Sequence, residues 1–332
     1  MTAEFDVLAI GNAIVDVIAP CKPDFLEREG LDVGAMTLIP ASRAETLYAR
    51  MAAGVESSGG SAANTAAGVA SFGGRAAFIG KVAEDALGEV FSQDMNATGV
   101  AFASVPLRHG PSTARCLVHV TPDGQRTMCT YLGACVELTV ADVDPALVTS
   151  AAIVYLEGYL FDPPQAREAF AKAARAARDA GRRIALSLSD PFVADRHREA
   201  LLTFIETDVD IVFANAAEVC ALFDTQDLTA ARRALGQRVE IAAVTEGPHG
   251  STVLHGERVV GIGAAPVNPV VDTTGAGDQY AAGFLFGLAR GLDLAECGAL
   301  GAMAAAEVIS HYGSRPKMAL AELGRQKGLL AA

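Results

Sequence analysis

The sequence contains no tryptophan, and aromatic residues make up only 6% of its 332 positions, so few side chains can stack on a flat ring. Its six cysteines are scattered, without Cys-x-x-Cys pairs or a metal-like spacing to histidine, which argues against disulfides and zinc and indicates reduced thiols. Residues 1–6 lack the basic start of a signal peptide, and no apolar run reaches membrane-spanning length. We therefore expect a cytoplasmic protein without a membrane partner.

Basic residues are scarce as well. The chain has 26 Lys and Arg against 39 Asp and Glu, which gives a net charge of −13. An acidic surface disfavours nucleic acids and anionic membranes. Any phosphate site must therefore be local, built from backbone N–H groups, a few Arg or Lys residues, and metal.

Several common catalytic motifs are missing. Residues 74–81 resemble a P-loop, but the spacing is one residue too long and Val82 replaces the required Ser or Thr. No Gly-x-Gly-x-x-Gly follows a strand, which disfavours a dinucleotide fold. The sequence also lacks a Ser-His-Asp nucleophile elbow and a His-Glu-x-x-His zinc motif.

Apolar strand-like runs alternate with helical segments along most of the chain, which predicts a parallel sheet with both faces covered. Two hairpins, at 114–131 and 251–261, interrupt this alternation. We expect an α/β three-layer sandwich with a mostly parallel central sheet, plus a small β lid formed mainly from about 17–40 and 112–132, in one domain over 1–332. The predicted strands are 5–10, 76–79, 152–156, 184–188, 211–214 and 240–245; the predicted helices are 61–72, 85–98, 164–180, 195–207, 276–289, 294–310 and 318–327.

The most informative stretch is residues 272–278, a glycine turn that leads into a long apolar helix with a carboxylate at its start. The unpaired N–H groups of a helix start bind anions. Gly275, Ala276 and Gly277 therefore predict an anion hole, and Asp278 a general base for a hydroxyl. The alternative is a plain helix N-terminus, where Asp caps and Gly permits the turn.

Four further segments precede this one along the chain, in the order in which the family has them: 59–65, 80–88, 215–218 and 244–250. With them, the chain resembles the ribokinase-like (PfkB) family of carbohydrate and nucleoside kinases from about residue 5 to residue 315. Within that family it is most similar to adenosine kinases. The resemblance implies ATP and Mg²⁺ as cofactors and Asp278 as the base.

The family resemblance implies that five residues bind the acceptor. Gly59 and Gly60 let the backbone approach a small polyol, and Asn64 hydrogen-bonds to sugar hydroxyls. Asp16 extends from the carboxyl end of the first strand and accepts hydrogen bonds from two vicinal hydroxyls. Asn12, four residues earlier, is the fifth of these residues. The alternatives are a helix turn capped by Asn64 and an ordinary loop acid at Asp16.

The resemblance places the nucleotide against the second half of the chain. Thr245, Gly247 and Gly250 suit a tight loop under its phosphates, and Asn215 and Asn268 fall where relatives approach it.

Two pairs of residues are candidates for metal ions. Asn215 and Glu218 can organise water around Mg²⁺, although a capped helix start is an equally good interpretation. Asp272 and Thr274 resemble positions that hold a monovalent cation, K⁺, in many members; simple turn bonding is the alternative.

The hypothesis is an ATP-dependent kinase that phosphorylates a primary hydroxyl of a nucleoside. The leading candidate is adenosine, which would be converted to AMP. Tyr159 and Phe192 could wall a purine, although ordinary packing explains both. The alternatives are a kinase for fructose, ribose or 2-keto-3-deoxygluconate, and a purine or sugar sensor without chemistry. Arg115, Arg126 and Arg315 are candidates for phosphate or lid contacts. A monomer is slightly favoured over a homodimer.

Overall fold

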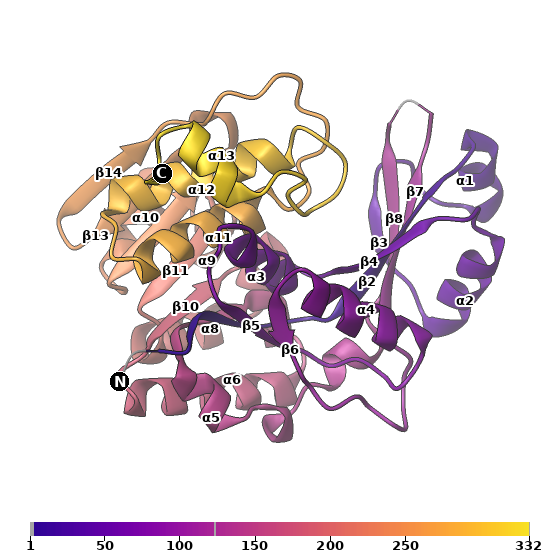
Figure 1. Ribbon diagram of the computed structural model, residues 1–332, viewed down its shortest axis with the longest axis horizontal. Helices are drawn as coiled ribbons and strands as arrows, with labels where there is room; N and C mark the ends of the chain where they lie inside the picture. Colours follow the sequence, from indigo (N-terminus) through magenta and orange to yellow (C-terminus); the bar gives the residue numbers. More distant parts are fainter. Residues whose placement is uncertain (1–2, 123, 332) are drawn as a thin grey trace.

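The computed structural model describes residues 3–122 and 124–331. In this part of the chain a large and a small sheet stand side by side, and helices cover both faces of the large one (Figure 1). The predicted α/β fold with a mostly parallel sheet and a smaller β lid is confirmed. The assignment of 1–332 to one domain stays a prediction.

The large sheet holds nine strands among the described residues, in the order β14-β13-β12-β11-β10-β9-β1-β5-β6. All pair in parallel except β13 and β14, which add an antiparallel hairpin at one edge. Their bounds are β1 Phe5–Ile10, β5 Ala76–Ile79, β6 Val100–Phe102, β9 Ala151–Glu157, β10 Arg183–Ser187, β11 Ile211–Asn215, β12 Ile241–Thr245, β13 Ser251–His255 and β14 Arg258–Ile262.

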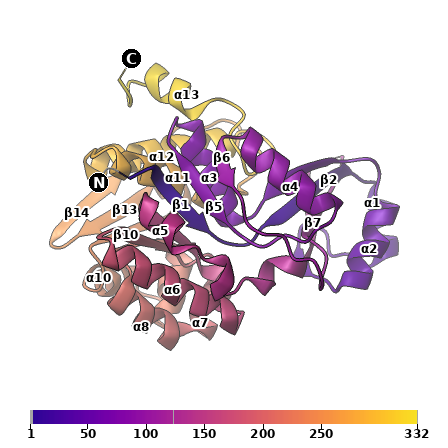
Figure 2. The same ribbon diagram turned by 60° about the horizontal axis from the view of Figure 1, so that its bottom comes forward.

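Alternate residues of β1 enter two separate cores, because successive strand side chains point to opposite faces. Val7 and Ala9 belong to the core on the face covered by α3, α11 and α12, whereas Leu8 and Ile10 belong to the core on the face covered by α5, α6 and α8 to α10. Helices cover the large sheet on both sides (Figure 2). Burial on both faces explains why these strands are nearly continuous apolar runs. The helices are α3 Ser61–Ser71, α4 Ala86–Ala97, α5 Pro145–Ser150, α6 Pro164–Asp179, α7 Pro191–Arg196, α8 Arg198–Asp208, α9 Ala216–Leu222, α10 Leu228–Gly236, α11 Ala276–Ala289, α12 Leu294–Val308 and α13 Leu320–Gln326.

The small sheet has five strands in the described residues, in the order β3-β8-β7-β2-β4. Helices α1 (Pro23–Glu29) and α2 (Ala41–Arg50) accompany it, and Leu47 of α2 shares a core with Val15 and Leu117 of the sheet. The strands are β2 Ile14–Pro20, β3 Met36–Leu38, β4 Val55–Gly59, β7 Ala114–Val120 and β8 Arg126–Tyr131.

The lid therefore differs in two respects from the segments predicted for it. Strand β4 lies outside 17–40, and Asp16 lies within β2, not at the carboxyl end of the first strand. β2 begins only a few residues after β1 ends, so the chain passes from the large sheet to the small one at Gly11–Ala13. No helix in the described part of the chain is long and apolar enough to cross a membrane.

Candidate active site

Two cavities adjoin the start of α11. The first, of about 500 Å³, is lined by residues from both sheets and includes Gly275 and Asp278. The second, of about 660 Å³, includes Ala276 and Gly277 on the other side of the same turn. A group that bridges the two cavities would therefore pass the N–H groups of the first helical turn.

The turn before α11 depends on Gly275. This residue caps the helix at φ 79°, a left-handed conformation that glycine adopts without strain. A Cβ at this position would lie 2.7 Å from the carbonyl oxygen of Ser314, so the chain can pass only without a side chain. The cap contributes no side-chain acceptor. The N–H of Ala276 donates to the carbonyl oxygen of Thr273 at 3.2 Å, which leaves the N–H groups of Gly277 and Asp278 to another partner.

The Asp278 carboxylate lies at the mouth of this turn and faces the first cavity. Its Oδ1 accepts a hydrogen bond from Ser61 Oγ at 2.6 Å, and its Oδ2 accepts one from Asn64 Nδ2 at 3.1 Å. Burial raises the pKa of Asp278, and these two hydrogen bonds partly offset the rise. A raised pKa makes the carboxylate a stronger base, which is the property proton abstraction needs.

Removing the Ser61 hydroxyl should move the pH dependence of turnover. Because that hydrogen bond favours the charged carboxylate, Ser61→Ala should raise the pKa of Asp278 further and shift the acid limb of kcat upward by about one pH unit. The kcat on the alkaline plateau, where Asp278 is ionised in both proteins, should fall only modestly, because Asn64 still holds the carboxylate, and serves as the internal control. A pH–rate profile measures the shift; an unmoved or lower acid limb would contradict the role of Ser61.

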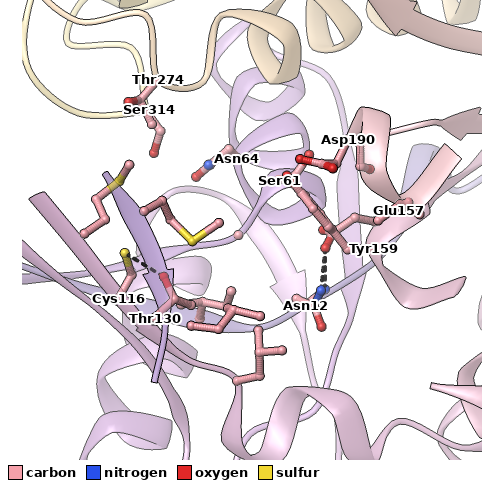
Figure 3. Close-up of a pocket in the computed structure, with 18 of the residues that line it drawn as sticks. Asn12, Ser61, Asn64, Cys116, Thr130, Glu157, Tyr159, Asp190, Thr274 and Ser314 are labelled. Carbon is pink, nitrogen blue, oxygen red and sulfur yellow. Dashed lines mark hydrogen bonds between the residues drawn. The ribbon is translucent and has the colours of Figure 1, made fainter. Parts of the chain in front are cut away.

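A hydrogen-bonded pair of polar residues, Asn12 and Glu157, lines the first cavity at the ends of β1 and β9 (Figure 3). Asn12 Nδ2 donates to Glu157 Oε1 at 2.7 Å, and the N–H of Ala62 donates to Glu157 Oε2 at 2.8 Å. Burial raises the pKa of Glu157 to about 7. Asn12 Oδ1 is buried and, among the described residues, has no hydrogen-bond donor, so it can accept one from a bound hydroxyl.

Asp16 also reaches this cavity, from the small sheet. Burial raises its pKa to about 6, against the nearby charges of Arg315 and Arg126. A Cβ at Gly59 would lie 2.5 Å from Asp16 Oδ2, and one at Gly60 would lie 2.1 Å from the carbonyl oxygen of Asn12. Gly60 is therefore required by close packing on the backbone, whereas a Cβ at Gly59 would displace the Asp16 carboxylate.

The amide of Asn64 is already engaged. Its Nδ2 contacts Asp278, and its Oδ1 accepts from Arg315 Nε at 3.3 Å. Arg315 also contacts Asp94 at 3.1 Å. Asn64 therefore orients the Asp278 carboxylate. Arg115, by contrast, stacks on Tyr48 and Tyr131 within the lid.

The residues expected near the nucleotide separate into two groups. Thr245, Gly247 and Gly250 line the second cavity. Asn268 lines a neighbouring groove bounded by 261–268, α12 and α13.

The Asn215 and Glu218 pair caps α9. Asn215 Nδ2 donates to Glu218 Oε1 at 2.7 Å, and Glu218 N–H donates to Asn215 Oδ1 at 2.9 Å. Burial raises the pKa of Glu218 to about 7. Neither residue is among those that line the two cavities. The capped helix start is thus observed, and no group of three or more His, Cys, Asp or Glu residues in the described chain could hold a metal ion.

Comparison with known proteins identifies the family of this chain. Residues 31–320 match the model of the pfkB family of carbohydrate kinases. The chain belongs to the PfkB family. The predicted family, and with it a phosphotransferase that uses an alcohol acceptor, is confirmed at this level. PfkB members generally use ATP and Mg²⁺.

Two solved structures cover nearly the whole chain. The adenosine kinase of Sinorhizobium meliloti is 53% identical, with a TM-score of 0.90, over 98% of this chain and 100% of that one. A "probable sugar kinase protein" from Rhizobium etli CFN 42 is 47% identical, with a TM-score of 0.92, over 99% and 100%.

Curated relatives are more distant or match in part. Adenosine kinase of Saccharomyces cerevisiae is 29% identical over 89% of this chain and 91% of that protein. An archaeal sugar kinase and a plant fructokinase are matched over only 42% and 63% of their own lengths.

Ser61, Glu157 and Ser314 also line the first cavity and were not singled out from the sequence. Ser61 lies within the segment 59–65 that indicated the family, so the motif could have drawn attention to it. Glu157 ends a strand that otherwise reads as apolar, and Ser314 contributes backbone atoms, so neither carries a local signal.

Proposed function

We propose that this PfkB member transfers the γ-phosphoryl group of ATP to the primary hydroxyl of a nucleoside, with adenosine as the acceptor. The proposal rests on one observation: two cavities adjoin the first turn of α11. One cavity would hold the acceptor beside Asp278, and the other the nucleotide against 245–250. Both are lined by a single chain, so a monomer can supply the complete site.

In this mechanism Asp278 takes the proton of the acceptor hydroxyl as its oxygen attacks in line. The N–H groups at Gly275–Asp278 stabilise the charge that spreads over the transferred phosphoryl group. Mg²⁺, when bound with ATP, supplies neutralisation of the phosphate charge. Ser61 and Asn64 hold the base in position.

The lining of the first cavity supports a nucleoside over a small sugar. Its polar side chains include Asn12, Asp16 and Asp278, which suit a ribose. Its apolar side chains suit a base, whose faces gain from apolar and aromatic contacts. They include Met36, Leu38, Val118, Met128, Leu132, Val136, Phe192 and Val193.

A sugar kinase is the second candidate, since the 47% identical solved structure from Rhizobium etli is described as a sugar kinase. A sensor would keep the pocket without the base. Asp278, held by two hydrogen bonds at the cavity, supports a catalyst over a sensor.

An ADP-release screen decides among these. With ATP and Mg²⁺ present, adenosine should give the highest kcat/KM in a panel with inosine, ribose, fructose and 2-keto-3-deoxygluconate. A signal from a sugar and none from adenosine would overturn the nucleoside assignment and leave a kinase. No acceptor-dependent signal at all would favour the sensor.

The variant Phe192→Ala tests whether the apolar lining of the first cavity contacts the base. The Phe192 side chain is 78% exposed and lines the cavity, so Phe192→Ala should leave the fold intact. If the ring packs on the base, KM for adenosine should rise about tenfold with little change in kcat. Val105→Ala, exposed to a similar extent but away from the cavity, is the control. An unchanged KM for adenosine would remove Phe192 from the base site.

A further inference from the structure

The residues that resemble a monovalent-cation site already hold a guanidinium group. Asp272 Oδ1 accepts from the N–H of Thr274 at 3.0 Å and from Thr274 Oγ1 at 2.7 Å. Asp272 Oδ2 accepts from Arg126 Nη1 and from the N–H of Gly313 at 3.2 Å. Both carboxylate oxygens therefore have donors, and one donor is positively charged.

A cation does not fit this arrangement. The Arg126 side chain is only 10% exposed, and its ion-pair partner Asp272 is 7% exposed. Nη1 of Arg126 also contacts Thr274 Oγ1 at 3.3 Å, so the second oxygen expected to bind K⁺ faces the same positive group. Two like charges this close inside a protein repel strongly. The site is thus neutralised by a side chain of this chain.

The arginine comes from the lid, and the lid hairpin docks at the same place. Arg126 opens β8, and 146 residues separate it from Asp272. Next to it, Gly124 packs so closely on Tyr312 that a Cβ would lie 2.0 Å from the phenolic oxygen. The hairpin between β7 and β8 therefore bridges the small sheet to the loops around 272 and 313.

These loops support the anion hole. Asp272 binds Thr274, which precedes the helix cap Gly275, and Gly313 binds Asp272 while Ser314 packs against Gly275. Arg126 is thus connected to the first turn of α11 through one intervening carboxylate. Its Nε is buried, lacks an acceptor among the described residues, and belongs to a side chain that lines the acceptor cavity.

We propose that Arg126 takes the place of a monovalent cation: it neutralises Asp272, fixes the turn at Gly275 and ties that turn to the lid. Phosphoryl transfer by this chain then needs no K⁺. The proposal rests on the kinase activity proposed above, and Arg126 acts in it as a positioning residue.

The first test needs no variant. Wild-type ADP release should be the same in buffers whose monovalent cation is K⁺, Na⁺ or a bulky organic ammonium at equal ionic strength. The melting temperature should likewise be insensitive to K⁺, because no site is open to it. A rate that rises with K⁺ over the other cations would overturn the proposal.

The second test opens the site. Arg126→Ala leaves a buried carboxylate without its counter-charge. In K⁺-free buffer its kcat should fall about tenfold to a hundredfold, the range for a lost hydrogen bond to a charged group. K⁺ should then raise both kcat and the melting temperature of Arg126→Ala, whereas Arg126→Lys, which keeps the charge, should respond less.

The control is Arg43→Ala. Arg43 also belongs to the lid region and forms an ion pair with Glu29, away from both cavities, so its removal should create no K⁺ response. An Arg126→Ala variant with wild-type kcat, or a loss that K⁺ restores in neither kcat nor melting temperature, would overturn the role of Arg126. If wild type phosphorylates none of the acceptors, the proposed function fails, whereas activity that requires K⁺ refutes only the inference.

Discussion

Replacing Asp278 by asparagine is expected to lower kcat by about two to four decades, the usual contribution of a positioned general base. The amide keeps the shape of the side chain but cannot take a proton. Ser61 and Asn64 can still surround it, although Asn64 then faces another amide. KM for ATP should change little, because the second cavity is untouched.

The pH dependence gives a second measure of the same residue. Burial raises the pKa of Asp278, so the reactive carboxylate accumulates only above that raised pKa. Turnover of the wild type should therefore fall as the pH drops through a value above the ordinary range for aspartate. In Asp278→Asn this acid limb should disappear.

Steady-state kinetics and thermal melts of purified Asp278→Asn check both statements. Asp195→Asn, which changes an exposed aspartate in an ion pair with Arg198, is the matched control and should leave kcat unchanged. Near-normal turnover in Asp278→Asn, with the acid limb retained, would remove Asp278 from the mechanism.

Two buried strands could be predicted from the sequence to the residue, and four others to within one residue at each end. The apolar runs at Phe5–Ile10 and Ala76–Ile79 match β1 and β5, since burial on both faces demands apolar side chains throughout. Strand β4 could not be predicted, because Val55–Gly59 has no apolar alternation. It is held by pairing with β2 and by Asp94, which accepts from the N–H of Ser58 at 2.8 Å.

One predicted helix has the wrong boundaries, because a capping signal lies before it in the sequence. The predicted helix at 195–207 is two helices, α7 and α8, which break at His197. The first begins early because Asp190 caps it, accepting from the N–H of Phe192 at 2.7 Å, and Pro191 follows at the first position.

The site divides in the same way between local and distant contacts. The turn at 275–278 could be predicted, because glycine, helix and carboxylate are adjacent in the chain. The pair of Asn12 and Glu157 could not, since 145 residues separate them. Only the folded sheet brings the carboxyl ends of β1 and β9 together.

Gly275→Ala is the second change from which we expect a large loss. Alanine at φ 79° costs about 1–2 kcal/mol in backbone strain alone. The added Cβ would also lie 2.7 Å from the Ser314 carbonyl oxygen and 2.8 Å from its Cα, which are backbone atoms that no rotamer change can move aside. The turn must therefore shift, and the N–H groups at the start of α11 shift with it.

A displaced anion hole loses its alignment with the transferred phosphoryl group. Removal of one such donor typically costs about 100- to 1,000-fold in kcat, and Gly275→Ala should lose at least that much. Gly291→Ala is a matched control just beyond the other end of α11, at φ 75° with no atom within 4 Å of its Cβ. It should lower stability by about 1–2 kcal/mol through the same strain and leave kcat unchanged.

Comparing kcat and melting temperature of the two variants separates strain from misalignment. Gly275→Ala should be destabilised more than Gly291→Ala, because only its Cβ meets backbone atoms. A kcat loss only in Gly275→Ala, in protein that remains folded at the assay temperature, would assign the loss to the turn itself. Wild-type kcat in Gly275→Ala would mean that phosphoryl transfer does not occur at the start of α11. Because both cavities adjoin this turn, that result would also separate the acceptor from the nucleotide.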